Sequence, residues 1–253
     1  MSNTMLLLSI DIGITHLAHC LVSVTDTFQI IDWEVLDLLG PQPTCTHFHK
    51  KQCKQPALFF RDTSFFCKKH ALPVPTLSGL TKPQLAELCK VHGITECETK
   101  EHMVEQLQSK KLTEVKRKSA KTCSAIDLGK ELVKQYERFA KVDIVVIENQ
   151  IGPLANRMKM LQGMVMQYWI MKKADVVCVS SVNKLKLFHT GPTTYAQRKK
   201  ISVDCVRKLI AANRWDTVFE KHKKKDDLAD TLLQAIWYLN NINADYLKLI
   251  VLI

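Results

Sequence analysis

The stretch that decides the fold is MLLLSIDIGITHLAHCLVSV, residues 5–24. It is apolar and rich in branched side chains up to Asp11, turns at Gly13 and becomes apolar again a few residues later. A third apolar stretch, residues 28–35, alternates apolar and polar side chains. This pattern predicts two or three adjacent strands at the start of the chain, most simply an antiparallel meander.

The second half of the chain alternates between helical and strand patterns. Amphipathic or apolar helices are predicted at residues 123–140, 154–172, 194–212 and from 226 to about 240, and buried strands at 142–148 and 175–180. Near-continuous Val/Ile runs between helices indicate strands that are covered on both faces. We therefore predict an α/β domain with a mixed sheet, antiparallel at first and parallel later, flanked by helices.

The composition excludes several classes of protein. The 253 residues are 46% hydrophobic and 24% charged, which is typical of a folded globular chain and not of a disordered one. No apolar run approaches the roughly 20 residues that span a bilayer, and Met5 to Leu8 is too short for a signal peptide. Nine cysteines then indicate an intracellular, reducing compartment, whether viral factory, nucleus or organelle. A net charge of +11 favours a polyanionic binding partner.

An insert with a different composition interrupts the domain. Residues 41–77 are rich in proline, cysteine and histidine and show little periodicity. A structural Zn²⁺ site is predicted there, with the ligands Cys45, Cys53, Cys67 and His70. His47 or His49 could replace one of these ligands, and the alternative is that the thiols are scattered and free. A segment with so little apolar periodicity needs such a metal to hold its shape.

Acidic residues stand at the ends of the predicted buried elements. Asp11 and Glu148 each end a strand, and Asp227 and Asp230 are three apart in the last helix, so they face the same side. Carboxylates gathered at strand ends repel one another unless a cation lies between them, and oxygen ligands suit Mg²⁺ or Mn²⁺. A pair of such ions can hydrolyse a phosphodiester. Taken singly, each acid could be a turn former or a cap, and for Asp226 a cap is the better reading.

Three segments in this order, SIDIGITHLAHCLV, VVIENQ and KKDDLADTLLQA, resemble the RuvC-like Holliday junction resolvases, particularly the poxviral and fungal mitochondrial members. The resemblance covers about seven tenths of the chain, residues 1–40 and 116–253, and implies an RNase H-like nuclease domain. It implies that Asp11, Glu148, Asp227 and Asp230 are the catalytic metal ligands. The family also has a lysine that assists catalysis, matched here by Lys184 or Lys186. Its homodimers pack the helix equivalent to 154–172 in the interface.

Two further features point to nucleic acid. Residues 78–115 contain a helical pair that resembles a SAP module, a small DNA-binding unit, although a plain helical hairpin is an equal alternative. Residues 110–141 and 183–225 carry net charges of +6 and +9. The residues predicted to bind DNA phosphates are Lys116, Arg117, Lys118, Lys186, Arg198, Lys199 and Lys200.

The sequence therefore predicts a Mg²⁺-dependent endodeoxyribonuclease that acts as a homodimer on four-way DNA junctions and makes paired nicks. An RNase H-like hydrolase of RNA–DNA hybrids and a non-catalytic DNA-binding protein of the same fold are the alternatives. A sugar-kinase-like ATPase, which DIGIT would also fit, is disfavoured because a second glycine-rich phosphate turn is missing.

Overall fold

The chain forms two compact units in the computed structural model, which describes residues 4–95, 97–116, 118–150, 156–215, 217 and 219–251. The first, here called the sheet unit, comprises Met1–Gly40 and Ala120–Ile253. The second, here called the insert unit, comprises Pro41–Ser119. Among the described helices, none combines the length and the apolar character that crossing a bilayer requires.

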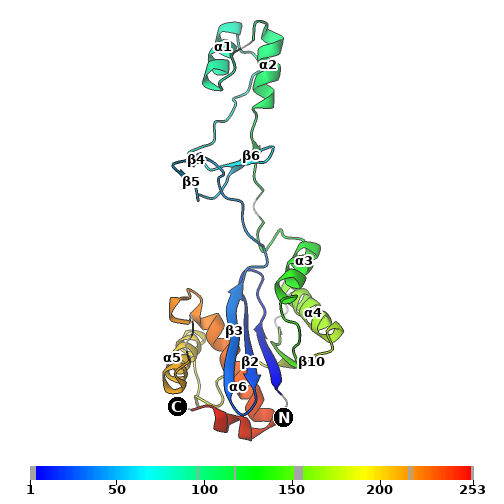
Figure 1. Ribbon diagram of the computed structural model, residues 1–253, viewed down its shortest axis with the longest axis vertical. Coiled ribbons are helices and arrows are strands. Elements are labelled where there is room, and N and C mark those ends of the chain that lie inside the picture. Colours follow the sequence, from blue (N-terminus) through cyan, green and yellow to red (C-terminus); the bar gives the residue numbers. More distant parts are fainter. Residues whose placement is uncertain are drawn as a thin grey trace. The chain divides into compact units, whose positions relative to one another are not determined.

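A five-stranded sheet, in the order β10-β9-β1-β2-β3, is the centre of the sheet unit (Figure 1). Its strands are β1 (Met5–Asp11), β2 (Leu17–Val24), β3 (Phe28–Leu36), β9 (Ile144–Glu148) and β10 (Asp175–Val179). The pairs β1–β2 and β2–β3 are antiparallel, whereas β9 runs parallel to both β1 and β10. The predicted α/β class with a mixed sheet is confirmed.

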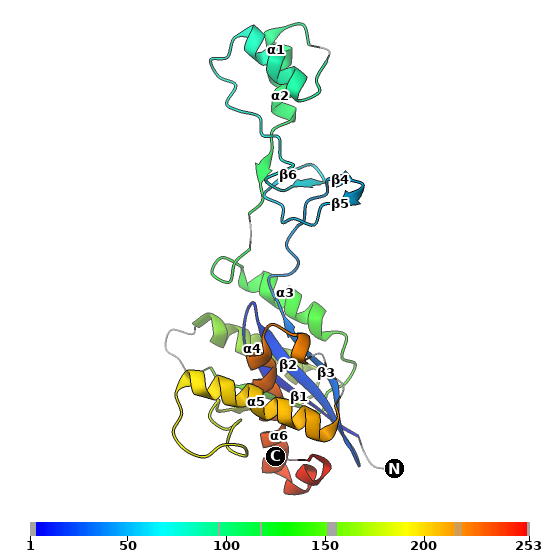
Figure 2. The same cartoon turned by 90° about the vertical axis from the view of Figure 1, so that its left-hand side faces the viewer.

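Helices cover both faces of this sheet. They are α3 (Ala125–Tyr136), α4 (Asn156–Met171), α5 (Tyr195–Asn213) and α6 (Lys225–Ile242), with short 3₁₀ helices at Phe219–Lys221 and Ala244–Leu249. One core joins the sheet to α5 and α6 and the other joins it to α3 and α4 (Figures 1 and 2). Leu7 and Leu8, both fully buried, enter opposite cores because side chains alternate along a strand. Because the parallel strands are covered on both faces, their sequences are nearly continuous apolar runs.

The turn after β1 requires glycine at position 13. A Cβ atom on Gly13 would lie 2.5 Å from the carbonyl oxygen of His16, closer than non-bonded atoms can approach. The same turn is tied to the end of β3 by a hydrogen bond from the Leu38 N–H to the Ile14 carbonyl, 2.9 Å long. Gly13 therefore fixes the path of the chain directly beyond Asp11.

A buried glutamine fixes α6 against the middle of the sheet. Gln234 is 3% exposed, and its Nε2 donates to Ser9 Oγ at 3.0 Å, to the Val146 carbonyl at 3.1 Å and to the Ile10 carbonyl at 3.3 Å. Ser9 and Ile10 belong to β1 and Val146 to β9. Gln234 lies four residues after Asp230, on the same side of the helix, so these bonds set the position of Asp230 relative to both strands.

We expect Gln234→Leu to lower the free energy of unfolding by about 1–3 kcal/mol, because it keeps the volume but leaves buried acceptors without their donor. Urea denaturation followed by circular dichroism measures this loss. Gln29→Leu, at an exposed position of β3, is the matched control and should stay within about 0.5 kcal/mol of the parent chain. Equal stability of the two variants would show that the Gln234 contacts contribute nothing.

The insert unit consists of short strands followed by a helical pair. Its elements are β4 (Phe48–His49), β5 (Lys51–Gln52), β6 (Phe59–Arg61), β7 (Ser64–Phe66), α1 (Lys82–Val91), α2 (Lys100–Ser109) and β8 (Thr113–Glu114). The strands form a β4–β5 hairpin and a sheet of order β7-β6-β8. Leu85, Cys89, Met103 and Leu107 form the small core between α1 and α2. The short strands are too brief for the sequence pattern to have predicted them.

Residues 41–77 have almost no apolar core of their own. Every residue of this range is described, and only Cys45, Ala57 and Cys67 are buried. Three buried residues give far less hydrophobic burial than a folded segment of this length needs. Other interactions must therefore hold this part of the insert unit together.

Candidate active site and Cys/His cluster

Three carboxylates from separate elements meet at one end of the sheet. Asp11 ends β1, Glu148 ends β9, and Asp230 lies in the second turn of α6. Ile10 pairs with Ile147 in the parallel ladder, so the residues that follow them, Asp11 and Glu148, come to lie side by side. One oxygen atom from each of the three carboxylates lies within 4.8 Å of the other two. The structure thus brings together three of the four acids that the sequence singled out.

A lysine lies among these acids. The Nζ atom of Lys184, in the segment after β10, is 2.8 Å from Oε2 of Glu148 and 2.5 Å from Oδ2 of Asp230. Although burial opposes it, the two carboxylates hold the pKa of Lys184 above its ordinary value. The sequence left Lys184 and Lys186 open, and the structure places Lys184 in contact with the acids.

The environment of Asp11 favours a cation. Burial, followed by the charge of Glu148, raises the pKa of Asp11 to about 8, although Lys184 acts in the opposite direction. Asp230 and Asp227 contribute further repulsion. A partly buried group of carboxylates that resists ionisation in this way fits a hard divalent cation such as Mg²⁺ or Mn²⁺, which would relieve the repulsion.

Asp227 faces the same cavity from one helical turn earlier in α6. The cavity has a volume of about 260 Å³. It is lined by Asp11, Ile12, Glu148, Gln150, Ser181, Val182, Lys184, Tyr195, Arg198, Lys199, Ser202, Asp227 and Asp230. Burial, and then the neighbouring Asp226, raise the pKa of Asp227. All four predicted acids and two of the predicted DNA-binding residues therefore share one cavity.

Sequence reasoning missed the neutral polar residues of this cavity. Tyr195 and Ser202 come from α5, and Gln150 follows β9. A single serine, tyrosine or glutamine has no spacing pattern that would mark it as part of a site. Only the packing of α5 beside α6 brings Tyr195 and Ser202 to the acids.

Asp226 has a different role from its neighbours, and the interpretation of it as a helix cap is wrong. Helix α6 begins at Lys225 with Lys224 as its N-cap residue, so Asp226 lies inside the first turn. Its carboxylate pairs with the ammonium group of Lys199 on α5. Although burial opposes it, this contact holds the pKa of Asp226 below its ordinary value. Asp226 thereby fixes the position of Lys199 at the cavity.

A second cleft adjoins the acidic cavity. It has a volume of about 410 Å³ and shares Ser181, Val182, Lys184 and Arg198 with the cavity. Lys186 and His189 line its other side. The two hollows therefore share part of their wall and are here taken as one depression, which holds both acidic and basic side chains.

The remaining predicted DNA-binding residues lie elsewhere. Lys200 is exposed on α5, next to Lys199. Lys116 and Lys118 belong to the insert unit. Arg117 lies outside the described residues.

The insert unit contains a compact Cys/His cluster. The sulfur atoms of Cys45, Cys53 and Cys67 and a ring nitrogen of His70 lie within 4.8 Å of one another. The His70 Nδ1 atom is 3.4 Å from the Cys45 sulfur and 3.5 Å from the Cys67 sulfur. In a tetrahedral zinc site, bond lengths of about 2.0 and 2.3 Å place nitrogen and sulfur ligands roughly 3.6 Å apart. The four side chains thus have the spacing of a zinc ligand set.

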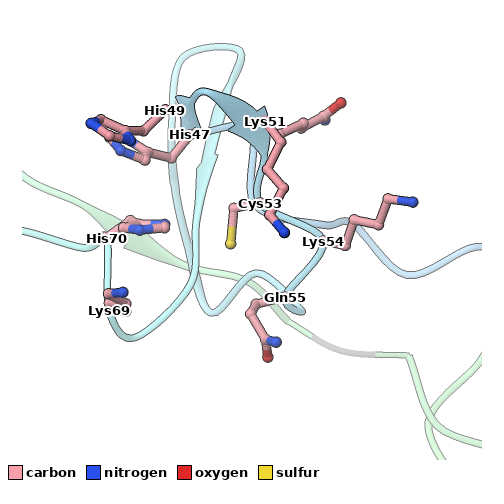
Figure 3. Close-up of a pocket in the computed structure, with 9 residues that line it drawn as sticks. His47, His49, Lys51, Cys53, Lys54, Gln55, Lys69 and His70 are labelled. Atoms are coloured by element: carbon pink, nitrogen blue, oxygen red, sulfur yellow. The ribbon is translucent and has the colours of Figure 1, made fainter.

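His47, the alternative ligand, lies against this cluster. Its ring packs against that of His70 at an angle of 31°, with 4.1 Å between the ring centroids. Figure 3 shows His47, His49 and His70 on the same side of the neighbouring cleft, opposite Lys54. The fourth member of the compact cluster is therefore His70, and His47 lies beside it.

Comparison with known proteins identifies relatives of the chain. The family model described as Poxvirus A22 protein matches residues 93–243. None of the curated proteins matches the sequence.

Among solved structures, the fowlpox virus resolvase in complex with substrate Holliday junction DNA is similar to this chain, with a TM-score of 0.51 and 13% identity, covering 94% of this chain and 99% of that chain. The yeast mitochondrial Holliday junction resolvase Ydc2 has a TM-score of 0.42 and 14% identity, covering 95% and 85%. Thermus thermophilus RuvC has a TM-score of 0.43 and 12% identity, covering 94% and 96%.

The likeness to the fowlpox virus resolvase shows the fold of the sheet unit and its helices, which is the RNase H-like fold that the resemblance in sequence implied. The family match spans more than half of the 253 residues. The chain therefore belongs to the Poxvirus A22 protein family.

Proposed function

We propose that this chain is a divalent-metal-dependent endonuclease that resolves four-way DNA junctions by paired nicks, leaving ends that a ligase can seal. The observation that carries the proposal is the meeting of Asp11, Glu148 and Asp230 within 4.8 Å at the end of an RNase H-like sheet. Membership of the poxvirus A22 family supports the choice of substrate, as does the fowlpox virus resolvase, which was solved with substrate Holliday junction DNA.

We assign Asp11, Glu148, Asp227 and Asp230 as the residues that hold two Mg²⁺ or Mn²⁺ ions. When bound, the ions would supply an activated water and stabilisation of the leaving oxygen. Lys184 donates charge-assisted hydrogen bonds to Glu148 and Asp230, which orients both carboxylates and reduces their mutual repulsion.

Basic residues beside the acids are needed because the carboxylates alone would repel a phosphate chain. Arg198 lines both the acidic cavity and the adjoining cleft, Lys199 lines the cavity, and Lys186 lines the cleft. We assign these residues, with the exposed Lys200, to the phosphates of the strand that enters the site. Contacts of this kind position the DNA without reading its bases.

We expect Arg198→Gln to raise KM for a four-way junction about tenfold, equivalent to roughly 1.4 kcal/mol of binding, and to change kcat by less than about threefold. Steady-state cleavage of a fluorescent junction measures both constants. Arg207→Gln is the matched control, because Arg207 lies on the same helix but pairs with Glu220 and Asp204. The same KM in both variants would remove Arg198 from the DNA path.

The function itself is tested by substrate choice. The full chain with Mg²⁺ should cut a synthetic four-way junction and leave a linear duplex of the same sequence uncut. Equal cutting of both would contradict structure selectivity. Preferred cutting of an RNA–DNA hybrid would assign the chain to RNase H-like hydrolysis, and junction binding without cutting in Mg²⁺ or Mn²⁺ would make it a non-catalytic binder.

A homodimer is part of the proposal, since two sites related by a twofold axis match two opposed strands. Helix α4 supports this role because Ile170 and Met171 at its end are 53% and 73% exposed. We expect sedimentation equilibrium at micromolar concentration to give the mass of two chains. A mass of one chain, with and without junction DNA, would contradict the dimer.

The insert unit has two proposed tasks. Zn²⁺ bound by Cys45, Cys53, Cys67 and His70 would hold residues 41–77 in shape. The helical pair α1–α2, with Lys116 and Lys118 after it, would grip a DNA arm in the manner of a SAP module. Because these cysteines must stay reduced to bind metal, we propose that the protein acts in an intracellular, reducing compartment.

A further inference from the structure

The largest hollow of the insert unit among those described lies beside the Cys/His cluster. It is an open cleft of about 750 Å³. Its basic side chains are Lys51, Lys54 and Lys69, and His47 and His49 add two further ring nitrogens each (Figure 3). In the figure, Lys51 and Lys54 lie on one side of the cleft and Lys69 lies on the other, near His70.

The charges of this cleft are unbalanced. None of the nine described residues that line it carries a carboxylate. Residues 41–70 contain six Lys or Arg and one acidic residue, Asp62. Three ammonium groups around one hollow repel one another, and an anionic ligand relieves that repulsion. This composition differs from an ordinary solvated surface, where both signs of charge alternate.

The cleft shares residues and backbone hydrogen bonds with the Cys/His cluster. The Cys53 N–H donates to the His47 carbonyl at 2.9 Å, and the Cys45 N–H donates to the Gln55 carbonyl at 2.8 Å. Cys53 and His70 belong both to the wall of the cleft and to the four-residue cluster. The backbone that presents the lysines is therefore fixed by the cluster, which reduces the cost of ordering the cleft around a ligand.

We propose that this cleft binds the phosphate backbone of DNA, as a contact separate from the acidic cavity. The inference rests on the proposed action on DNA and adds a second point of attachment to it. Lysines bind phosphates as mobile point charges, and the imidazole N–H groups can donate to phosphate oxygens. The ammonium groups of the cleft contact phosphates, which carry no sequence information, so we expect this contact to be independent of sequence.

The test uses the full chain and a fluorescent four-way junction in a buffer without added Mg²⁺ or Mn²⁺ and without chelator, so that zinc stays bound and binding is measured without cleavage. We expect the triple variant Lys51→Gln, Lys54→Gln, Lys69→Gln to bind the junction about tenfold more weakly at low salt. We also expect the slope of log K against log salt to fall by about 2 to 3, near 0.9 for each lost phosphate contact. The matching Lys→Arg triple variant keeps the charges and should restore both values.

The control triple variant is Lys172→Gln, Lys173→Gln, Lys248→Gln, at exposed positions of the sheet unit. Unchanged affinity and salt slope in the cleft variant, or equal losses in the control, would overturn the inference. So would competition of the cleft contact by millimolar inorganic phosphate, because that result indicates a small-anion site. A parent chain that binds the junction but never cuts it would contradict the proposed nuclease and leave the binding result intact.

Discussion

Asp230→Asn is expected to abolish junction cleavage while the junction stays bound. Asparagine keeps the size of the side chain but removes a charge from the three-carboxylate group and one of the two acidic partners of Lys184. We expect the cleavage rate to fall by about 10³-fold or more, equivalent to roughly 4 kcal/mol of transition-state stabilisation. Junction affinity should be unchanged or slightly higher, because one negative charge has left the DNA-binding depression.

Single-turnover cleavage in Mg²⁺, and junction binding without added Mg²⁺ or Mn²⁺ and without chelator, separate these two effects. Asp227→Asn should also abolish cleavage if Asp227 helps to hold the ions from the wall of the cavity. Asp204→Asn is the matched control, since Asp204 is a partly exposed carboxylate of α5 that pairs with Arg207 and does not line the cavity. Turnover of Asp230→Asn at the rate of the parent chain would remove Asp230 from the catalytic site.

Cys67→Ser is expected to lower the zinc content from about one ion per chain to nearly none and to loosen residues 41–77. Backbone N–H groups of His70 and Lys69, acting against burial, hold the pKa of Cys67 below its ordinary value, which favours the thiolate that zinc requires. Structural zinc sites in small peptides contribute about 10–16 kcal/mol of binding free energy. Because Cys45, Ala57 and Cys67 are the buried residues of this range, little else can replace the metal.

Metal analysis after dialysis measures the zinc, and limited proteolysis reports the loosening as new cleavage within residues 41–77. Cys97→Ser is the matched control in the same unit, because Cys97 packs beside α1 and α2 and not in the cluster. Zinc content equal to that of the parent chain in Cys67→Ser would show that the ligand set is wrong. Full protease resistance without zinc would show that the metal does not hold the fold.

The sequence by itself determined the strands of the five-stranded sheet and the acids at their ends, but not the short strands of the insert unit. Strand and helix periodicity are local patterns that the sequence shows directly. Adjacent strands without a helix between them indicated antiparallel pairing, and the later strands separated by helices indicated parallel pairing. Asp11 and Glu148 come directly after buried runs, and parallel strands bring their carboxyl ends to one edge. The Cys67-x-x-His70 spacing likewise indicated a metal site because both ligands lie on one short turn.

Only the tertiary structure decided which side chains touch these acids. Lys184 reaches Glu148 and Asp230 because the segment after β10 returns across the sheet end, and no periodicity in the sequence separates it from Lys186. The buried hydrogen bonds of Gln234 and the ion pair between Asp226 and Lys199 likewise come from the packing of separate elements. These contacts join residues that are far apart in the sequence. They depend on the paths of loops and on the reach of long side chains, which local sequence patterns do not reveal.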